Sequence, residues 1–402
     1  MDFSTTTNLL IKILNHFDFS TVGDTFEKYL RFLPIFIIGA IAALILTPII
    51  GQIALKYDIT YKPGIKRKGR EYDNQEKAIH EGITPALGGL AITIPAFIAI
   101  LLFFKLDSFT IPILVAFLIL IIGSALDDIF NLPAKAQFIY QTLAATIIAF
   151  SVINLTNLSI FNINLDVYTW NFSLFGLQQS LVLPGDILLI LWIVVCINAF
   201  KWTAGSPGII ESNSLVIFLL IFIIGVRFSS MFSTTISILI AGGLSVFLIF
   251  ALPPQKIMTG SAGKTVYGFL ICVLSIITDA KLSTTIILLA LPIMDFVYVI
   301  IKRYIEHKPK NFKELIKING LDHFHHQLIK LGLNRMQIVL VEMAITLLLG
   351  AFAILTTGAL KYFALVFVIA ISIGIIVLIN IKASKKQEKE KKEESPESKY
   401  SY

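Results

Sequence analysis

Two adjacent carboxylates, Asp127 and Asp128, end an apolar run of about fifteen residues in the stretch SALDDIFNL. Ionised side chains at membrane depth are costly, and they usually line a polar cavity in which they act on an ion or a substrate. A structural role, as an interfacial pair that ends a helix, is the weaker interpretation because two negative charges oppose the dipole at a helix C-terminus. The pair could hold Mg²⁺, which prefers oxygen ligands and phosphate partners. Alternatively, one aspartate could bind the metal while the other takes a proton from a nucleophile.

A histidine cluster forms the second group of reactive side chains. Three of the six histidines of the chain, His323, His325 and His326, lie within four residues and follow Asp322 directly. A zinc site is one interpretation, although no Cys or Glu stands nearby at the spacing of known zinc motifs. A phosphate site at a helix N-terminus is another, because backbone N–H groups and the helix dipole add to any imidazolium charge. A solvated surface cluster is the third.

Two glycine-containing turns could bind an anion. The stretch MTGSAGKTVYGF, residues 258–269, contains GKT, but Met258 stands where a P-loop needs its first glycine, so the spacing excludes that motif. A glycine-rich turn that opens a helix still suits an anion. The stretch NAFKWTAGSPG, residues 198–208, similarly places small residues after the end of a helix.

Membrane-spanning helices must position these groups. The chain has 402 residues, of which 56% are hydrophobic and only 15% charged, and its mean hydropathy of +0.82 is well above that of soluble domains. Apolar stretches near twenty residues, the length that crosses a bilayer as a helix, recur along the chain. They predict an all-α integral membrane protein with about eleven spans, at 33–55, 85–104, 110–126, 137–155, 182–200, 209–226, 232–252, 266–279, 284–301, 337–356 and 362–381. Alternation within 156–181 predicts one small β-hairpin on the outer side.

The distribution of basic residues predicts the topology. Segments 56–80 and 302–336 are rich in Lys and Arg, whereas 156–181 contains neither. The positive-inside rule then places the N-terminus outside and the C-terminus in the cytoplasm. The cytoplasmic side receives the polar segments 56–84, 127–136, 201–208, 253–265 and 302–336. We expect an outer segment (1–32), a transmembrane domain (33–381) and a disordered cytoplasmic tail (382–402).

Taken in order, these motifs resemble those of the polyprenyl-phosphate N-acetylhexosamine-1-phosphate transferases, glycosyl transferase family 4. The resemblance covers about residues 33–381 and rests on HEGITPALGGLAI, DDIFNLPAKAQFIYQ, NAFKWTAGSPG, MTGSAGKTVYGF, PIMDFVYVIIKR and DHFHHQLIKLGL. It implies transfer of a sugar-1-phosphate from a UDP-sugar to polyprenyl phosphate, as the first membrane step of cell-envelope glycan synthesis. It implies a multi-pass protein of the cytoplasmic membrane whose active-site loops are cytoplasmic.

The resemblance also implies residue roles. Asp127 and Asp128 would be catalytic and would bind Mg²⁺. The residues that would bind substrate are Asn198, Lys201, Gly205, Gly260, Gly263, Lys264, His323, His325 and His326. The implied partners are a UDP-sugar, polyprenyl phosphate and membrane lipids, without nucleic acid, and a homodimer is a candidate assembly.

The chain departs from the family pattern at several of these positions. Three family aspartates are absent, at Ala204, Pro207 and Ser261, and the last of them ligates Mg²⁺ in the family. Two family basic residues are replaced by Ala86 and Gln137, and two neutral ones by Lys201 and Lys264. Loss of a carboxylate should weaken Mg²⁺ binding, and the two lysines could hold a diphosphate directly. These departures keep a second hypothesis open, a non-catalytic paralogue that binds lipid phosphate or nucleotide sugar. A transporter is the third, and the motif order argues against it.

Overall fold

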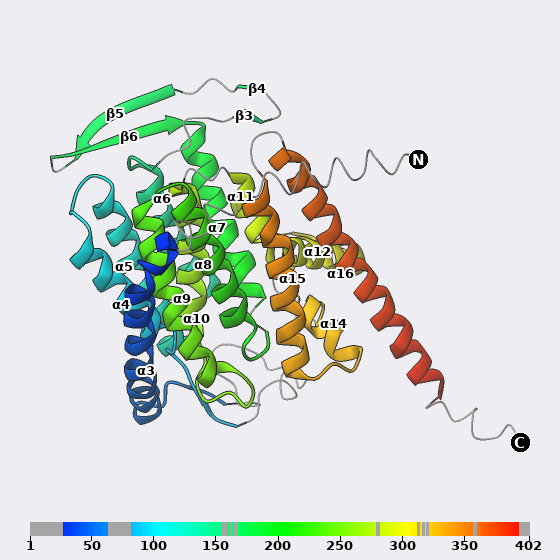
Figure 1. Cartoon of the computed structure of the whole chain (residues 1–402). Coiled ribbons are helices and arrows are strands. Elements are labelled where there is room, and N and C mark those ends of the chain that lie inside the picture. Colours follow the sequence, from blue (N-terminus) through cyan, green and yellow to red (C-terminus); the bar gives the residue numbers. More distant parts are fainter. Residues whose placement is uncertain are drawn as a thin grey trace, which may run out of the picture.

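A computed structural model describes most of the chain (Figure 1). The described residues are 27–62, 82–153, 159–160, 163–164, 168–174, 176–203, 205–278, 282–311, 314–315, 318, 321–356 and 360–393. The basic stretch 66–70, Ala204 and the end of the predicted tail lie outside them.

Helices make up most of the described structure. Their bounds are α3 Leu33–Lys56, α4 Leu90–Phe103, α5 Thr110–Phe130, α6 Ala134–Ala149, α7 Gly185–Trp202, α8 Ile209–Arg227, α9 Met231–Ala251, α10 Gly260–Ile277, α11 Leu282–Leu288, α12 Ala290–His307, α14 Phe324–Lys330, α15 Arg335–Leu355 and α16 Leu360–Glu393. Each predicted span overlaps one of these helices or, for 284–301, the α11–α12 pair. The α16 helix continues past residue 381, where we expected the transmembrane domain to end.

The predicted count of eleven spans is not confirmed. Eight helices of the described structure are long and apolar enough to cross a membrane, or nine if α11 and α12, which meet at a 77° bend, form one span. The other two predicted spans correspond to α4 and α6, which have 14 and 16 residues. At 1.5 Å per residue these helices are about 21 and 24 Å long, which is less than the roughly 30 Å hydrocarbon core.

Strands are few and short. β5 (Tyr168–Leu174) and β6 (Leu177–Leu183) pair in antiparallel fashion and form the hairpin predicted within 156–181. Two further two-stranded sheets join β1 (Thr60–Tyr61) to β2 (Thr84–Pro85) and β3 (Ser159–Ile160) to β4 (Ile163–Asn164). The β1–β2 pair matters for the site because it fixes the chain just before α4.

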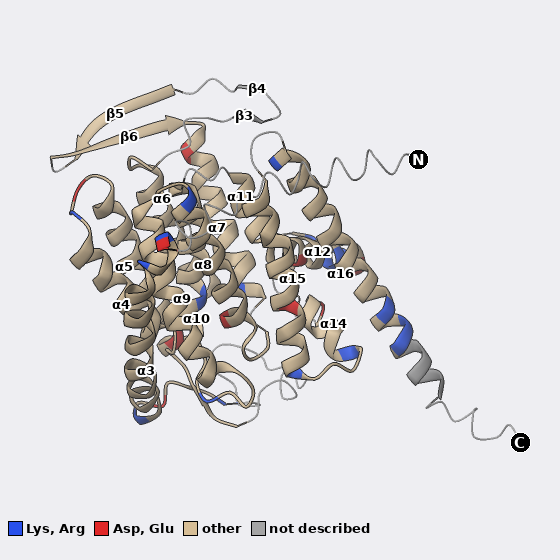
Figure 2. Ribbon diagram, viewed as in Figure 1, with Lys and Arg blue, Asp and Glu red and all other residues tan. Residues whose placement is uncertain are grey.

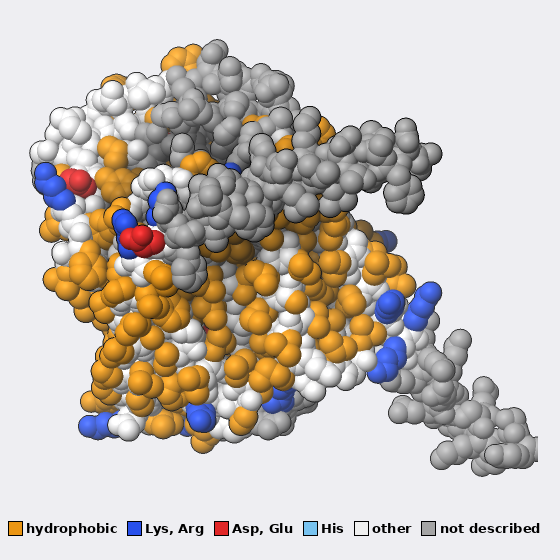
Figure 3. All heavy atoms as spheres, viewed as in Figure 1, with side chains coloured by type: hydrophobic (Ala, Val, Ile, Leu, Met, Phe, Trp, Pro, Cys, Tyr) orange, Lys and Arg blue, Asp and Glu red, His pale blue; other side chains and the backbone are white. Residues whose placement is uncertain are grey.

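The centre of the bundle is formed by α8, α9 and α10, which are mostly buried, whereas α3 and α16 are mostly exposed. Close packing of α3 on α9 depends on glycine: a Cβ at Gly39 would lie 2.0 Å from the Leu239 carbonyl oxygen, and one at Gly242 would lie 2.0 Å from that of Phe36. The exposed faces of the outer helices are apolar, as lipid contact requires. Figure 3 shows them as a broad hydrophobic band with Lys and Arg below it.

The two ends of the bundle differ. In Figure 1 the β5–β6 hairpin covers the upper end, while the α7–α8 and α9–α10 connections and α14 lie at the lower end. Figure 2 shows many of the described Lys and Arg positions, coloured blue on the ribbon, at the lower end and along the lower half of α16. The candidate residues are gathered at this basic end.

Candidate functional site

Asp128 lies at the C-terminal end of α5 and caps α10. Its Oδ1 accepts a 2.7 Å hydrogen bond from the backbone N–H of Ser261, and its Oδ2 accepts a 3.0 Å bond from that of Ala262. These are first-turn amides of α10 that have no partner within their own helix, and the N-cap residue Thr259 makes no side-chain cap bond. A carboxylate from another helix therefore takes the usual place of a local N-cap side chain.

The start of α10 is shaped for this contact. Gly260 has φ +68°, a conformation that favours glycine, and a Cβ there would lie 2.3 Å from the Oδ2 atom of Asp128. The candidate residue Gly260 thus allows the carboxylate to approach the helix end.

Asp127 bonds to side chains rather than to the backbone of α10. Its Oδ1 accepts a 2.8 Å bond from the Gln137 amide on α6, and its Oδ2 accepts a 2.5 Å bond from the Ser261 hydroxyl. Gln137 in turn accepts a 2.7 Å bond from the Lys201 ammonium at the end of α7. One glutamine thus joins a carboxylate and a cation that are 74 positions apart in the chain.

The turn before α4 packs directly on the turn before α10. Gly88 and Gly89 donate backbone hydrogen bonds to the carbonyls of Met258 and Thr259, at 2.9 and 2.8 Å, and the Met258 N–H donates to Pro85 at 2.8 Å. Gly263 is buried where the two helices meet, because a Cβ there would lie 3.1 Å from the Cα of Gly89. Gly263 therefore allows the two turns to pack closely.

A small pocket opens beside the aspartate pair. It is lined by Ser206, Pro207, Ile210, Glu211, Gln255, Met258, Thr259 and Lys264. The Thr259 hydroxyl donates a hydrogen bond to Glu211 within it, and Lys264 lies within electrostatic range of both Asp128 and Glu211. The pocket thus combines carboxylate, ammonium, amide and hydroxyl groups at the end of the bundle.

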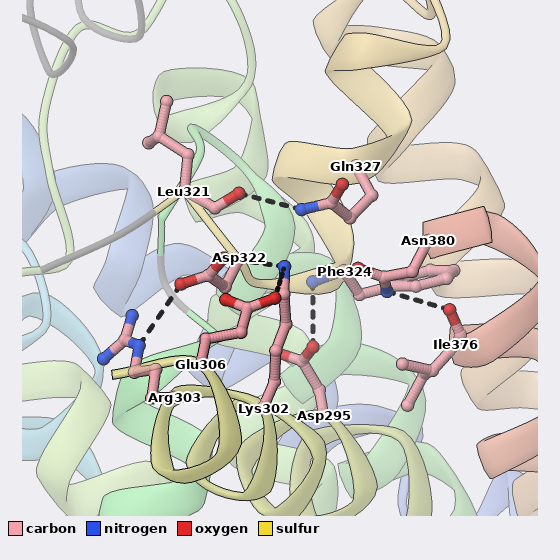
Figure 4. Close-up of polar contacts among 10 residues, drawn as sticks. All are labelled: Asp295, Lys302, Arg303, Glu306, Leu321, Asp322, Phe324, Gln327, Ile376 and Asn380. Carbon is pink, nitrogen blue, oxygen red and sulfur yellow. Dashed lines mark hydrogen bonds and ion pairs between the residues drawn. The ribbon is translucent and has the colours of Figure 1, made fainter. Parts of the chain in front are cut away.

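The histidine cluster is held by α12. Asp295 of α12 bonds through Oδ2 to the Nδ1 atom of His323 at 2.8 Å. Its Oδ1 accepts a 2.8 Å bond from the Phe324 N–H, which Figure 4 shows. Asp322 is bonded by Lys302 at 2.9 Å and by Arg303 at 3.3 Å. Burial raises the pKa of Asp322, but the hydrogen bonds and charges of Lys302 and Arg303 outweigh it and hold that pKa below its ordinary value.

Two histidines of the cluster are buried and uncharged near neutral pH. Burial, together with the neighbouring histidines, holds the pKa of His325 well below its ordinary value, and burial lowers the pKa of His326 to about 3. The Nε2 atom of His325 is buried without a hydrogen-bond partner in the described structure. A Cβ at Gly205 would lie 2.0 Å from that atom. The contact connects the cluster to the α7–α8 connection that begins just after Lys201.

The structure brings most of the predicted residues to one end of the bundle, though in different roles. Lys201, Gly260 and Lys264 surround the aspartate pair, and Gly205 packs on the histidine cluster. Asn198 instead donates a 2.8 Å bond to Gln141 on α6.

Sequence reasoning assigned no site role to Gln137 or Asp295. Gln137 stands where the family pattern has a basic residue, and Asp295 lies in PIMDFVYVIIKR, one of the segments that resemble the family. For Asp295, the signal that could have singled it out was a carboxylate inside an apolar helix.

The aspartate pair as it stands does not fit a Mg²⁺ ion. All four carboxylate oxygens already accept protein hydrogen bonds. The neutral Ser261 side chain stands where a third carboxylate would be expected. Among the described residues, no group of three or more His, Cys, Asp and Glu side chains is placed to hold a metal ion. The chemistry proposed below therefore uses no metal ion.

Comparisons with known proteins point to one family. Residues 109–279, which include the aspartate pair, the Lys201 turn and α10, match the model of glycosyl transferase family 4. A "probable undecaprenyl-phosphate N-acetylglucosaminyl 1-phosphate transferase" of Bacillus subtilis is 26% identical over 360 residues, which cover 87% of this chain and 92% of the relative. An undecaprenyl-phosphate alpha-N-acetylglucosaminyl 1-phosphate transferase of Salmonella typhi is 24% identical, over 74% of this chain and 77% of the relative.

A second type of relative is also found. A phospho-N-acetylmuramoyl-pentapeptide-transferase of Staphylococcus saprophyticus is 25% identical, over 66% of this chain and 83% of the relative. The family match, these relatives and the membrane helices agree with one another. The match to glycosyl transferase family 4 covers residues 109–279 of the chain.

Proposed function

We propose that this chain transfers a sugar-1-phosphate, of the N-acetylhexosamine type, from a UDP-sugar to polyprenyl phosphate. Two of the relatives carry this kind of activity in their names, with undecaprenyl phosphate as acceptor. The observation that carries the proposal is the Asp127–Gln137–Lys201 network, which places a carboxylate and a cation together at the end of a membrane bundle, where a lipid phosphate could reach them.

The reaction is a phosphoryl transfer. An oxygen of the lipid phosphate attacks the sugar-bearing phosphorus of the UDP-sugar, a new P–O bond forms, and the bond to the UMP phosphate breaks. Such reactions are accelerated mainly by positioning and by stabilisation of charge. Asp127 is the side chain that we assign to take a proton from the lipid phosphate. Its oxygens accept bonds from side chains, which can rotate away, whereas those of Asp128 accept backbone amides of the helix that it caps.

Positive charge near the diphosphate would come from Lys201 and Lys264. A lysine binds phosphate as a point charge, and Lys264 also lines the pocket beside the aspartates. The neutral His325 and His326 would contribute hydrogen bonds rather than charge, and the neighbouring His323 is oriented by Asp295.

We place the site on the cytoplasmic side of the cell membrane. Basic residues favour the cytoplasmic end of membrane helices, and the site end of this bundle carries Lys56, Lys302, Arg303, Lys330 and Arg335. The UDP-sugar would then enter from the cytoplasm and polyprenyl phosphate from the surrounding bilayer.

The test is UMP formation by purified protein from UDP-N-acetylglucosamine and undecaprenyl phosphate. We expect UMP release that requires both substrates and that falls at least about 100-fold in Asp127→Asn, the size expected for loss of a general base. Glu27→Gln, a change at an exposed residue outside the site, is the control.

Lack of UMP release under every condition, with UDP-sugar still bound, would instead support a non-catalytic paralogue. Lack of both release and binding would overturn the proposal.

A further inference from the structure

The hydrogen bonds of the aspartate pair bear on whether this site binds a divalent metal ion or relies on lysine side chains for positive charge. Both oxygens of Asp128 accept backbone amides of α10, and the two oxygens of Asp127 accept the Gln137 amide and the Ser261 hydroxyl. Asp127 and Asp128 are also buried, with 7% and 5% of their surfaces exposed. Binding of Mg²⁺ would have to redirect these oxygens, because the ion requires nearly octahedral oxygen coordination at close range.

Removal of Asp128 from the end of α10 would be costly. The amides of Ser261 and Ala262 would lose their acceptor, and an unpaired amide in a buried place is destabilising. Gly260 fits the Asp128 carboxylate closely, so the helix end and the aspartate form one packed unit. The arrangement is that of a helix cap, and the hydroxyl of Ser261 beside it is bonded to Asp127.

Two lysine side chains already supply positive charge near the aspartate pair. Lys201 reaches the Asp127 network through Gln137, and Lys264, one turn into α10, acts on Asp128 and Glu211. A lysine ammonium at these positions opposes a divalent cation by charge repulsion but attracts a diphosphate.

We propose that this site binds the diphosphate of its nucleotide substrate without a divalent cation, and that Lys201 and Lys264 supply the positive charge. The choice of a UDP-sugar rests on the proposed function, whereas the exclusion of the metal rests on the hydrogen bonds of the aspartate pair alone.

Binding of Mn²⁺ alone provides the first test, because this paramagnetic ion replaces Mg²⁺ and its free concentration can be measured by electron paramagnetic resonance. Purified wild-type protein should leave the free Mn²⁺ signal unchanged up to about 1 mM. The double substitution Ser261→Asp with Lys264→Ser adds a carboxylate and removes a cation, so we expect it to bind Mn²⁺ at least about 10-fold more tightly. Stoichiometric Mn²⁺ binding by the wild type below about 0.1 mM, tighter than weak extracellular-type cation sites, would overturn the proposal.

Binding of UDP provides the second test and does not depend on how the double variant folds. The dissociation constant of UDP, measured by calorimetry on the wild type, should agree within about twofold between EDTA and 10 mM Mg²⁺, whereas Lys264→Met should weaken it about 10-fold. A 10-fold loss of affinity in EDTA would show that a metal is required and would overturn the proposal.

The two proposals fail differently. If no UMP is released but UDP binds equally well without metal, the proposed transferase activity is wrong and the proposal of metal-independent binding stands. If UMP is released but release stops in EDTA, the transferase activity stands and the proposal of metal-independent binding is wrong.

Discussion

Lys201 at the end of α7 donates a 2.7 Å hydrogen bond to Gln137 on α6. Since Gln137 also donates to Asp127 at 2.8 Å, the glutamine amide is oriented with its oxygen toward the cation and its nitrogen toward the carboxylate. The network joins three helices, α5, α6 and α7, and connects the Asp127 carboxylate on the first to the Lys201 ammonium on the last.

Exchange of these two side chains should therefore be tolerated better than loss of either. We expect Lys201→Met to lower UMP formation at least about 10-fold, because a charged partner of the network is lost. The double substitution Gln137→Lys with Lys201→Gln moves the cation to the other helix and should recover most of that activity. UMP assays on the two variants check this, with thermal melting as the control for folding. If the exchange variant is no better than Lys201→Met, the position of the cation rather than its presence is what matters.

The two aspartates should differ in what their removal does. In Asp128→Asn the side chain keeps only one oxygen for the two amides of α10, so we expect a loss of about 0.5–2 kcal/mol of stability, as for loss of a helix cap. Asp127→Asn should melt close to the wild-type temperature but lose transfer activity. Melting curves in detergent and UMP assays measured on both variants separate the two roles. Equal destabilisation by the two substitutions would contradict the assignment of Asp128 as the cap.

Gly205 should not tolerate a larger side chain. The added Cβ of Gly205→Ala would lie 2.0 Å from the His325 ring, so the α7–α8 connection or α14 must shift. We expect at least about a 10-fold loss of UDP affinity, since a displacement near 1 Å in a binding site is costly. Gly374→Ala on α16 is the matched control, because nothing lies within 4 Å of the added Cβ. Wild-type affinity in Gly205→Ala would show that the histidine cluster does not position the binding site.

Stability should fall as the pH falls below neutral. The folded pKa of His326, at about 3, is below that of a histidine in the unfolded chain. Between about pH 6.5 and 3 the unfolded chain therefore binds a proton that the folded protein does not, and stability declines by up to about 1.4 kcal/mol per pH unit for each such histidine. His326→Gln should reduce this slope, as measured by melting temperature against pH. The slope should be unchanged in His307→Gln, because that side chain is exposed.

Local sequence patterns were enough to predict most helices, the hairpin and the titratable residues of the candidate site. Hydropathy is a local property, so the apolar stretches located the helices, and the alternation within 156–181 located the hairpin. Hydropathy could not decide whether α4 and α6 are long enough to span a bilayer, because the ends of a helix depend on the turns that pack around them. The aspartate pair and the histidines were visible because charged or titratable groups are rare beside apolar runs.

The contacts among these side chains, and the structural role of each, follow from the tertiary structure alone. Asp128 and Ser261 are 133 positions apart in the chain, and their contact exists because α5 ends where α10 begins. The same packing makes Asp128 a helix cap, places Gln137 between Asp127 and Lys201, and sets Gly205 against His325. Such contacts depend on how distant helices pack, and that packing is not written in the local pattern of any one segment.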